Sequence, residues 1–244
     1  DYYGVFVLEP RFGFNPATMS VWITDQIRNF LLSAILGLPL LLVAVCCMTW
    51  FHETWWLLLW IVLITFNIGI AAIYPKFIAP LFNRFEPLKD VELTRRIQTL
   101  LERNHFKPAG LFVMDGSKRS AHGNAYFTGF GPAKRIVFFD TLLTHLSHDE
   151  IIAVLAHELG HLRKKHIWQQ MIAMAGLSFV LLFLLSRLAQ SSLFYESLNV
   201  AYQTIPVTLL LFIELVPFLL FPLTPLLSAI SRKNEFEADR FAAT

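Results

Sequence analysis

The chain has 244 residues, of which 55% belong to the apolar class AVILMFWYC and only 16% are charged, with 23 phenylalanines. This composition excludes an ordinary soluble globule and favours a membrane protein, because long uncharged runs carry the apolar excess. The net charge of +2 gives no reason to expect nucleic acid as a partner.

Four segments are apolar enough to cross a bilayer: residues 30–50, 55–74, 167–186 and 204–230. Each has at least about the 20 residues that a membrane-spanning helix needs. The last is longer and contains four prolines, so we expect its helix to be kinked or interrupted. Its one acid, Glu214, either lines a wet interior or lies near an interface.

Lysine and arginine gather on one side of these segments. Residues 75–166 contain 14 of the 20, and others lie before the first segment and after the last. The links 51–54 and 188–203 contain none, and Arg187 alone falls outside the scheme. The positive-inside rule therefore predicts a multi-pass protein with both ends and the 75–166 region in the cytoplasm. Four crossings return the chain to its starting side, so connectivity and charge agree.

Residues 75–166 predict a small α+β unit. Residues 91–104 have helical spacing with a polar face, and residues 111–114 and 136–139 are short apolar runs that indicate strands, the second after a Gly131-Pro132 turn. The predicted fold class is thus mainly α, a polytopic membrane protein with a small cytoplasmic α+β unit.

A metal-binding pattern follows in the sequence HELGH at positions 157–161. Two histidines at i and i+4 project from one face of a helix and can bind one Zn²⁺. Glu158 lies beside the first ligand, where its carboxylate can take a proton from a water on the metal. Ser147 and Glu150 match a capping box that would start this helix. If the helix runs unbroken into the third span, it has about 40 residues and a length of roughly 60 Å.

A catalytic zinc usually has three protein ligands and a water. The best candidates for the third protein ligand follow the fourth span. Glu235 and Asp239 are also at i and i+4. One of them could bind the metal while the other accepts the outer ring N–H of a ligand histidine. Glu237 should point elsewhere and ranks behind Glu235. The predicted topology brings these acids to the same side as the two histidines. An isolated H-E-x-x-H match can equally be a surface helix, and its setting is what favours the metal site.

At this point the chain resembles the type I CAAX prenyl endopeptidases, membrane zinc proteases that include the yeast a-factor-converting enzyme and bacterial relatives. The resemblance rests on RFGFN (11–15), YPKFIAPLF (74–82), GSKRS (116–120), NAYF (124–127), KRIVFFDTLL (134–143), HELGH (157–161) and SRKNEFEAD (231–239).

The resemblance implies roles for particular residues. It implies His157, His161 and Glu235 as the ligands of one zinc ion, Glu158 as the general base, and Asp239 as a catalytic partner that orients a ligand. It also implies transmembrane helices around a large water-filled chamber. Family members have further spans upstream and a cytoplasmic tail downstream, so the resemblance leaves a fragment as one interpretation of this chain.

The same resemblance makes Asn124, Ala125 and their neighbours a substrate-binding edge strand. An extended segment over residues 122–130 could pair with a peptide by strand addition. His122 could then donate a hydrogen bond to substrate. Without the family, the glycines here would indicate only a loop, and His122 a loop histidine.

The predicted organisation has five parts: an N-terminal cytoplasmic segment (1–29), two spans (30–74), the cytoplasmic catalytic unit (75–166), two more spans (167–230) and a C-terminal segment with the third zinc ligand (231–244). The predicted partners are a peptide or protein substrate, for which the family implies a prenylated CaaX C-terminus, and the lipid bilayer. The loops favour a bacterial inner membrane over the endoplasmic reticulum, and the oligomeric state is left open.

The favoured function is that of a membrane zinc endopeptidase. One alternative is a membrane-protein quality-control protease without prenyl specificity. Another, from a different class, is a zinc-stabilised scaffold or a transporter. A structural zinc would need a closed shell, usually with cysteine, and a transporter would be expected to have paired charges in its spans.

Overall fold

The computed structural model describes residues 2–14, 17–129 and 134–243. The chain forms two compact units. The first contains residues 1–32, 69–164 and 236–244, and the second contains residues 33–68 and 165–235. Both units are therefore assembled from segments that lie far apart in the sequence.

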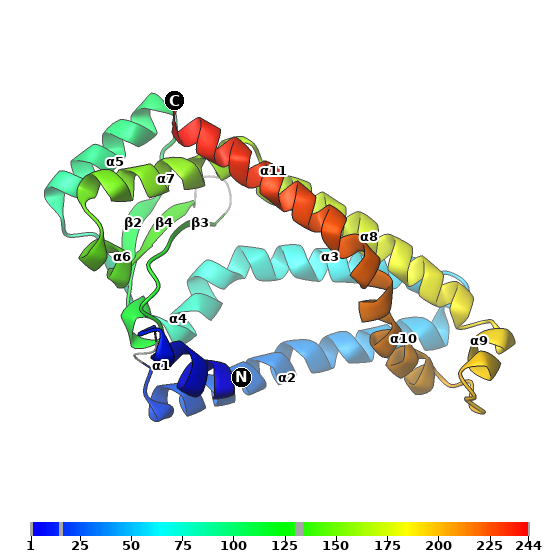
Figure 1. Cartoon of the computed structure of the whole chain (residues 1–244). Helices are drawn as coiled ribbons and strands as arrows, with labels where there is room; N and C mark the ends of the chain where they lie inside the picture. Colours follow the sequence, from blue (N-terminus) through cyan, green and yellow to red (C-terminus); the bar gives the residue numbers. More distant parts are fainter. Residues whose placement is uncertain (1, 15–16, 130–133, 244) are drawn as a thin grey trace. The chain divides into compact units, whose positions relative to one another are not determined.

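Four helical stretches are long and apolar enough to cross a membrane, which confirms the four predicted spans (Figure 1). The elements are α2 (Met19–Trp50); α3 (Trp55–Ile73) continuing through η2 (Tyr74–Ile78) and α4 (Ala79–Phe82); α8 (His166–Leu188); and α10 (Ile205–Leu220) continuing through η5 (Phe221–Leu223) and α11 (Thr224–Ala242). Each extends beyond its apolar run into polar sequence.

Proline accounts for the irregular turns in these helices. Proline lacks the N–H that an α-helix needs at each interior position. Pro75 lies in the π-helical turn η2, and Pro222 lies in the 3₁₀ turn η5 between α10 and α11. The predicted interruption of the fourth span is thus confirmed.

In the second unit, α3 and α8 pack together. Trp55 and Leu59 are buried against Leu182 and Leu185, and the indole N–H of Trp60 donates to the backbone carbonyl of α8 at residue 175, over 2.9 Å. A short helix that the sequence did not indicate, α9 (Ser192–Ser197), joins α8 to α10.

The first unit contains a four-stranded sheet in the order β1-β2-β4-β3. Its strands are β1 (Phe85–Pro87), β2 (Gly110–Met114), β3 (Ala125–Thr128) and β4 (Arg135–Phe139). The central pair β2 and β4 is parallel, and β1 and β3 are antiparallel edges. The two predicted strands are confirmed as this central pair. The predicted Gly131-Pro132 turn lies outside the described residues.

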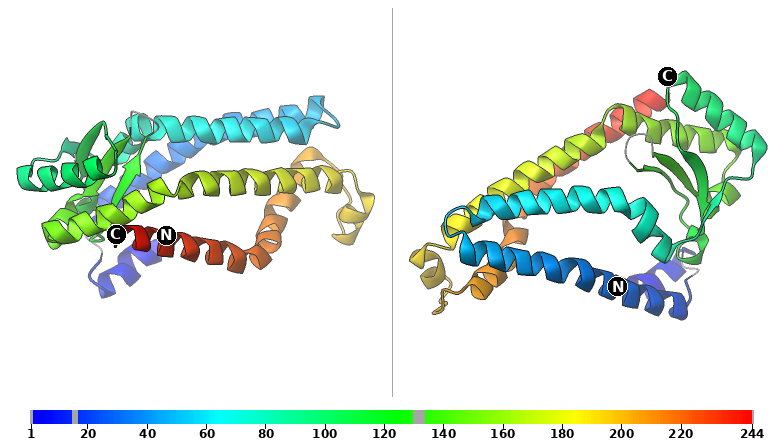
Figure 2. Two further views of the ribbon diagram at one scale, coloured as in Figure 1. Left: turned by 90° about the horizontal axis from the view of Figure 1, so that it is seen from above. Right: turned by 180° about the vertical axis from the view of Figure 1, so that it is seen from behind.

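Helices α5 (Val91–Arg103) and α7 (His148–Arg163) cover one face of this sheet (Figures 1 and 2). The core between them consists of buried aliphatic side chains and one ring, at positions Leu93, Ile97, Leu101, Ile136, Phe138, Ile151, Leu155 and Leu159. Burying one such side chain stabilises the fold by about 1.5–3 kcal/mol. The core therefore fixes α7 on the sheet.

Both ends of α7 are well defined. At the start, the Ser147 hydroxyl accepts the Glu150 N–H while the Glu150 carboxylate accepts the Ser147 N–H, which confirms the capping box. At the other end α7 stops at Arg163, and Lys165 is left-handed with φ 58°. A new helix then begins at His166. The helix of about 40 residues considered from the sequence is therefore two helices.

The remaining elements are short and belong to the first unit: η1 (Gly4–Leu8), α1 (Glu9–Arg11), η3 (Gly116–Lys118) and α6 (Asp140–His145).

Candidate metal centre

The two histidines of the motif lie on α7 one turn apart and converge. Their Nε2 atoms are 3.1 Å apart. Two nitrogens bound to one tetrahedral zinc ion at about 2.05 Å would be about 3.3 Å apart. The spacing of His157 and His161 therefore fits a shared cation.

Asp239 reaches the first histidine from α11. Its Oδ1 lies 2.8 Å from Nδ1 of His157. A carboxylate in this place accepts the Nδ1 proton, so the lone pair remains on Nε2, the nitrogen that faces His161. The role expected for Asp239, to orient a ligand, agrees with this contact.

Glu235 lies one turn before Asp239 on the same helix. Ligand atoms of His157, His161 and Glu235 all lie within 4.8 Å of one another. Two imidazole nitrogens and one carboxylate oxygen are a donor set typical of catalytic zinc. In the described part of the chain these three form the one cluster of this kind. The residues present therefore fit zinc.

Glu158 follows the first histidine on α7 and is half-buried. A carboxylate beside the ligand set can accept and return a proton during hydrolysis. The capping box and the core fix the rotation of α7, which decides where this carboxylate points.

Within the extended segment predicted over residues 122–130, the structure has strand β3 (Ala125–Thr128) at the edge of the sheet, and residue 130 lies outside the described residues. Ala125 is 1% exposed and packs in the core, so only its backbone could meet a peptide. The exposed Asn124 precedes the strand, and its carbonyl accepts the backbone N–H of Phe139. Helix α7 packs against β3. The edge strand therefore adjoins the helix that carries the histidines.

His122 is exposed, but contacts with three residues hold it in place. Its ring stacks on Phe14 with centroids 4.3 Å apart, and its Nδ1 lies 2.7 Å from the Ser120 hydroxyl. Its backbone carbonyl accepts the Thr141 hydroxyl. The contacts with Phe14 and Thr141 could not be predicted from the sequence, because both residues lie far from His122 along the chain.

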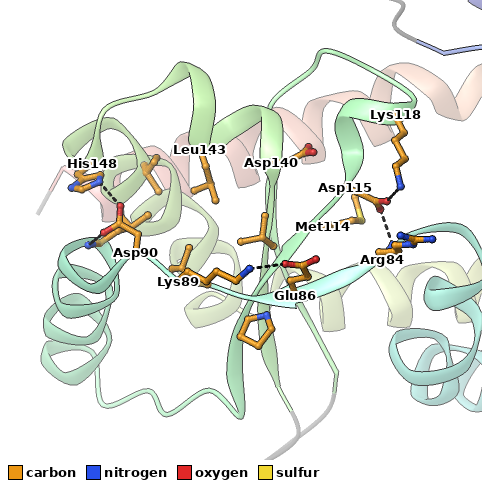
Figure 3. Close-up of a pocket in the computed structure, with 15 residues that line it drawn as sticks. Arg84, Glu86, Lys89, Asp90, Met114, Asp115, Lys118, Asp140, Leu143 and His148 are labelled. Carbon is orange, nitrogen blue, oxygen red and sulfur yellow. Dashed lines mark hydrogen bonds and ion pairs between the residues drawn. The ribbon is translucent and has the colours of Figure 1, made fainter.

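A cavity of about 480 Å³ lies on the same unit between β1, the start of α5, α6 and the start of α7 (Figure 3). Four of its charged or titratable side chains form pairs, Lys89 with Glu86 and His148 with Asp90. The N–H of Leu93 at the helix start, and then His148, lower the pKa of Asp90. None of the zinc-cluster residues lines this cavity.

Two family models together match nearly the whole chain. Residues 87–244 match the model of peptidase family M48, and residues 1–84 match the model described as "CAAX prenyl protease N-terminal, five membrane helices". CAAX prenyl protease 1 of Saccharomyces cerevisiae is 39% identical over 99% of this chain and 57% of its own length. The human homologue is 29% identical over 98% of this chain and 59% of its own length.

A solved structure has the same fold. The crystal structure of S. mikatae Ste24p matches with a TM-score of 0.91 and 38% identity, over 99% of this chain and 60% of that one. The chain thus spans less than two thirds of the relatives that it matches. Because the M48 model covers well over half of its residues, including all the zinc-cluster residues, the chain belongs to peptidase family M48.

Proposed function

We propose that this chain carries the active site of a membrane zinc endopeptidase. The observation that carries the proposal is the convergence of His157, His161 and Glu235, with Asp239 on the outer nitrogen of His157. In a chain of family M48, this arrangement supports peptide-bond hydrolysis rather than a structural zinc site.

Zinc bound there would polarise the scissile carbonyl and make the attacking water more acidic. The residues of the chain supply the rest of the chemistry. His157, His161 and Glu235 hold the ion, and Asp239 keeps His157 in the tautomer that binds it. Glu158 accepts the proton of the attacking water and passes it to the leaving amine.

The substrate is proposed to bind as an added strand on β3. Its backbone would bond to the open edge near Asn124 and Ala125, beside α7. His122 is held at the same end of β3 by Phe14 and Ser120, where it could donate to a substrate carbonyl.

We propose a prenylated protein C-terminus as the substrate class, since the yeast and human relatives are named CAAX prenyl protease 1 and its homologue. Turnover of unlipidated membrane proteins is the competing role. Peptides that differ only in a farnesyl group, assayed on the purified protein in nanodiscs, separate the two. Faster cleavage of the farnesylated peptide supports the proposal, and equal rates favour the competing role.

The chain is a multi-pass membrane protein, and we propose that its metal centre faces the cytoplasm. Charge asymmetry around the spans supports this side. The relatives compared come from yeasts, a slime mould, plants, a tapeworm and mammals. They support the endoplasmic reticulum over the bacterial inner membrane that the loops favoured.

The decisive test is Glu158→Gln. The variant should retain stoichiometric zinc, because the ligands are untouched, and lose cleavage by several orders of magnitude. Glu102→Gln, an exposed change on α5, serves as the matched control and should cleave normally. A Glu158→Gln protein that hydrolyses peptides at the wild-type rate would overturn the mechanism.

A further inference from the structure

A second cavity in the first unit lies where two predicted spans meet water. It has a volume of about 280 Å³ and is lined by the first turns of α2, by α4 with the two residues after it, and by the loop that follows β2. We call it the interfacial basic pocket. Arg28 in its wall is two residues before the first apolar run, which begins at Phe30. The pocket therefore lies close to the depth of lipid headgroups.

Positive charge dominates this pocket. Four cationic side chains, Arg28, Arg84, Lys118 and Arg119, line it together with two carboxylates, Asp25 and Asp115. The wall therefore has an excess of two positive charges.

One of the four cations, Arg119, is already hydrogen-bonded to other parts of the protein. Arg119 donates from two nitrogens to the Asp25 carboxylate, over 2.6 and 3.0 Å, and it also donates to Asn83 Oδ1 and to the carbonyl of Phe82. These bonds join α2, the end of α4 and the loop after β2. Arg119 thus has a structural role in the wall of the pocket, and its charge neutralises that of Asp25.

The second carboxylate is neutralised in the same way. Asp115 pairs with the Lys118 ammonium and accepts the backbone N–H of Arg84 over 2.7 Å. Partial burial alone would raise the pKa of Asp115, but Lys118 and the Arg84 N–H outweigh it and hold that pKa below its usual value. Asp115 is therefore ionised at neutral pH and offsets Lys118.

Two guanidinium groups are left for a ligand. Arg84 is exposed, and among the described residues its side chain has no ion-pair partner. Arg28 approaches Asp25 only to 3.7 Å, and its side chain is 46% exposed. Arginine forms paired hydrogen bonds with phosphate oxygens. An anion with phosphate chemistry is the ligand that these groups fit.

Apolar surface continues from the pocket on both helices. Leu81 lines the pocket and is half exposed, and Phe30 and Leu31 on α2 are more than half exposed. Acyl chains could lie against these side chains while their headgroup occupies the pocket. A soluble phosphate would gain nothing from this surface.

We infer that the interfacial basic pocket binds the phosphate headgroup of an anionic phospholipid, with Arg28 and Arg84 as its principal ligands. Basic pockets at the cytoplasmic ends of membrane helices are suited to such lipids. The lipid would join the first two spans to the loop that precedes β3, next to the contacts that Arg119 already makes.

The test measures lipid retention by native mass spectrometry. Protein is released from nanodiscs that contain phosphatidylcholine with phosphatidylserine or phosphatidylinositol. Wild type should retain one anionic lipid. Arg28→Gln with Arg84→Gln should weaken retention about 30-fold, from about fivefold per arginine. Arg103→Gln with Lys107→Gln removes equal charge outside the pocket and should retain the lipid.

Two further arms make the result decisive. Arg84→Lys keeps the charge but loses the paired geometry, so retention should fall between wild type and the double variant, and this holds even if the double variant folds poorly. Inorganic phosphate and inositol phosphate, added to protein in detergent, should neither displace the lipid nor raise the Tm as the lipid does. Equal retention by all variants, or equal stabilisation by the soluble phosphates, would overturn the inference.

Discussion

Gly160 lies directly against Ala238, so that α7 and α11 meet backbone to backbone beside the metal centre. A Cβ placed on Gly160 would be 2.9 Å from the Cα of Ala238 and 3.0 Å from its carbonyl oxygen. Ala238 itself is completely buried. This contact fixes how closely α11 approaches α7. It thereby fixes the positions of Glu235 and Asp239, which lie on either side of Ala238 in the sequence of α11.

Replacing Gly160 by alanine should displace α11 and impair the metal centre. Alanine favours a helix over glycine by about 1 kcal/mol, but here its methyl group would overlap backbone that cannot move aside. We expect peptidase activity to fall by about 10- to 100-fold, as for a displacement of about 1 Å, with weaker zinc binding. Steady-state kinetics and zinc content by mass spectrometry measure both.

The matched control is Gly176→Ala. Gly176 lies in α8 with no atom within 4 Å of an added Cβ, so the same change should leave activity intact and slightly raise the Tm. Normal activity and zinc content in Gly160→Ala would show that the close approach does not position the ligands.

Asp239→Asn should weaken zinc binding without removing a ligand. An amide can present its NH₂ to Nδ1 of His157, which favours the tautomer that turns a proton toward the cation. Loss of such an orienting carboxylate typically costs 10- to 100-fold in metal affinity or activity. Competition with a zinc chelator gives the affinity, and Asp149→Asn, a carboxylate 90% exposed on α7, is the control. An unchanged zinc affinity would contradict the role given to Asp239.

Ser147→Ala should destabilise the start of α7. The change removes the hydroxyl that accepts the Glu150 N–H, and loss of such a cap costs about 1 kcal/mol. Ser147→Asp should restore most of the stability, because aspartate also accepts at this position. Thermal unfolding in detergent, followed by intrinsic fluorescence, compares the three proteins. If alanine and aspartate behave alike, the cap is not the cause.

Acid should destabilise the first unit partly through Glu92 on α5. Hydrogen bonds from Arg95 and then Arg96 lower the pKa of Glu92 from 4.5 to about 2. A carboxyl group with a lowered folded-state pKa stabilises the fold above its unfolded pKa, and this stabilisation is lost as pH falls through the folded value. The Tm should therefore decrease as the pH is lowered from about 4.5 to about 2. This decrease should be less steep in Glu92→Gln. Parallel Tm–pH curves for the two proteins would rule Glu92 out.

Local patterns were enough to predict most of the metal centre. The spacing of His157 and His161 and the Ser147–Glu150 cap are properties of a single helix, so the sequence alone determines them. Glu235 and Asp239 needed one further step, the number of membrane crossings that separate them from the motif, and the choice of Glu235 as the ligand came from the family resemblance. What the sequence could not supply is the contact of Gly160 with Ala238, since nothing in either helix alone requires a small residue there.

Other features could not be predicted from the sequence, for identifiable reasons. Strand β1 has three residues and ends in a proline, which is too short for an alternating pattern. Lys165 adopts a left-handed conformation without the glycine or proline that usually marks a helix end. Arg119 and Asp25 are separated by 94 positions, and single distant pairs of this kind leave no local signature.

The left-handed residue at position 165 has a mechanical consequence. Spans change their tilt when bilayer thickness changes, and an uninterrupted rod would convey every such tilt to the two imidazole rings. Because α7 ends at Arg163 and α8 begins at His166, after the left-handed Lys165, the two helices do not form one uninterrupted rod. We therefore expect a change in the tilt of the span to have little effect on the orientation of the two imidazole rings, which the contacts of α7 with the sheet and with α11 determine.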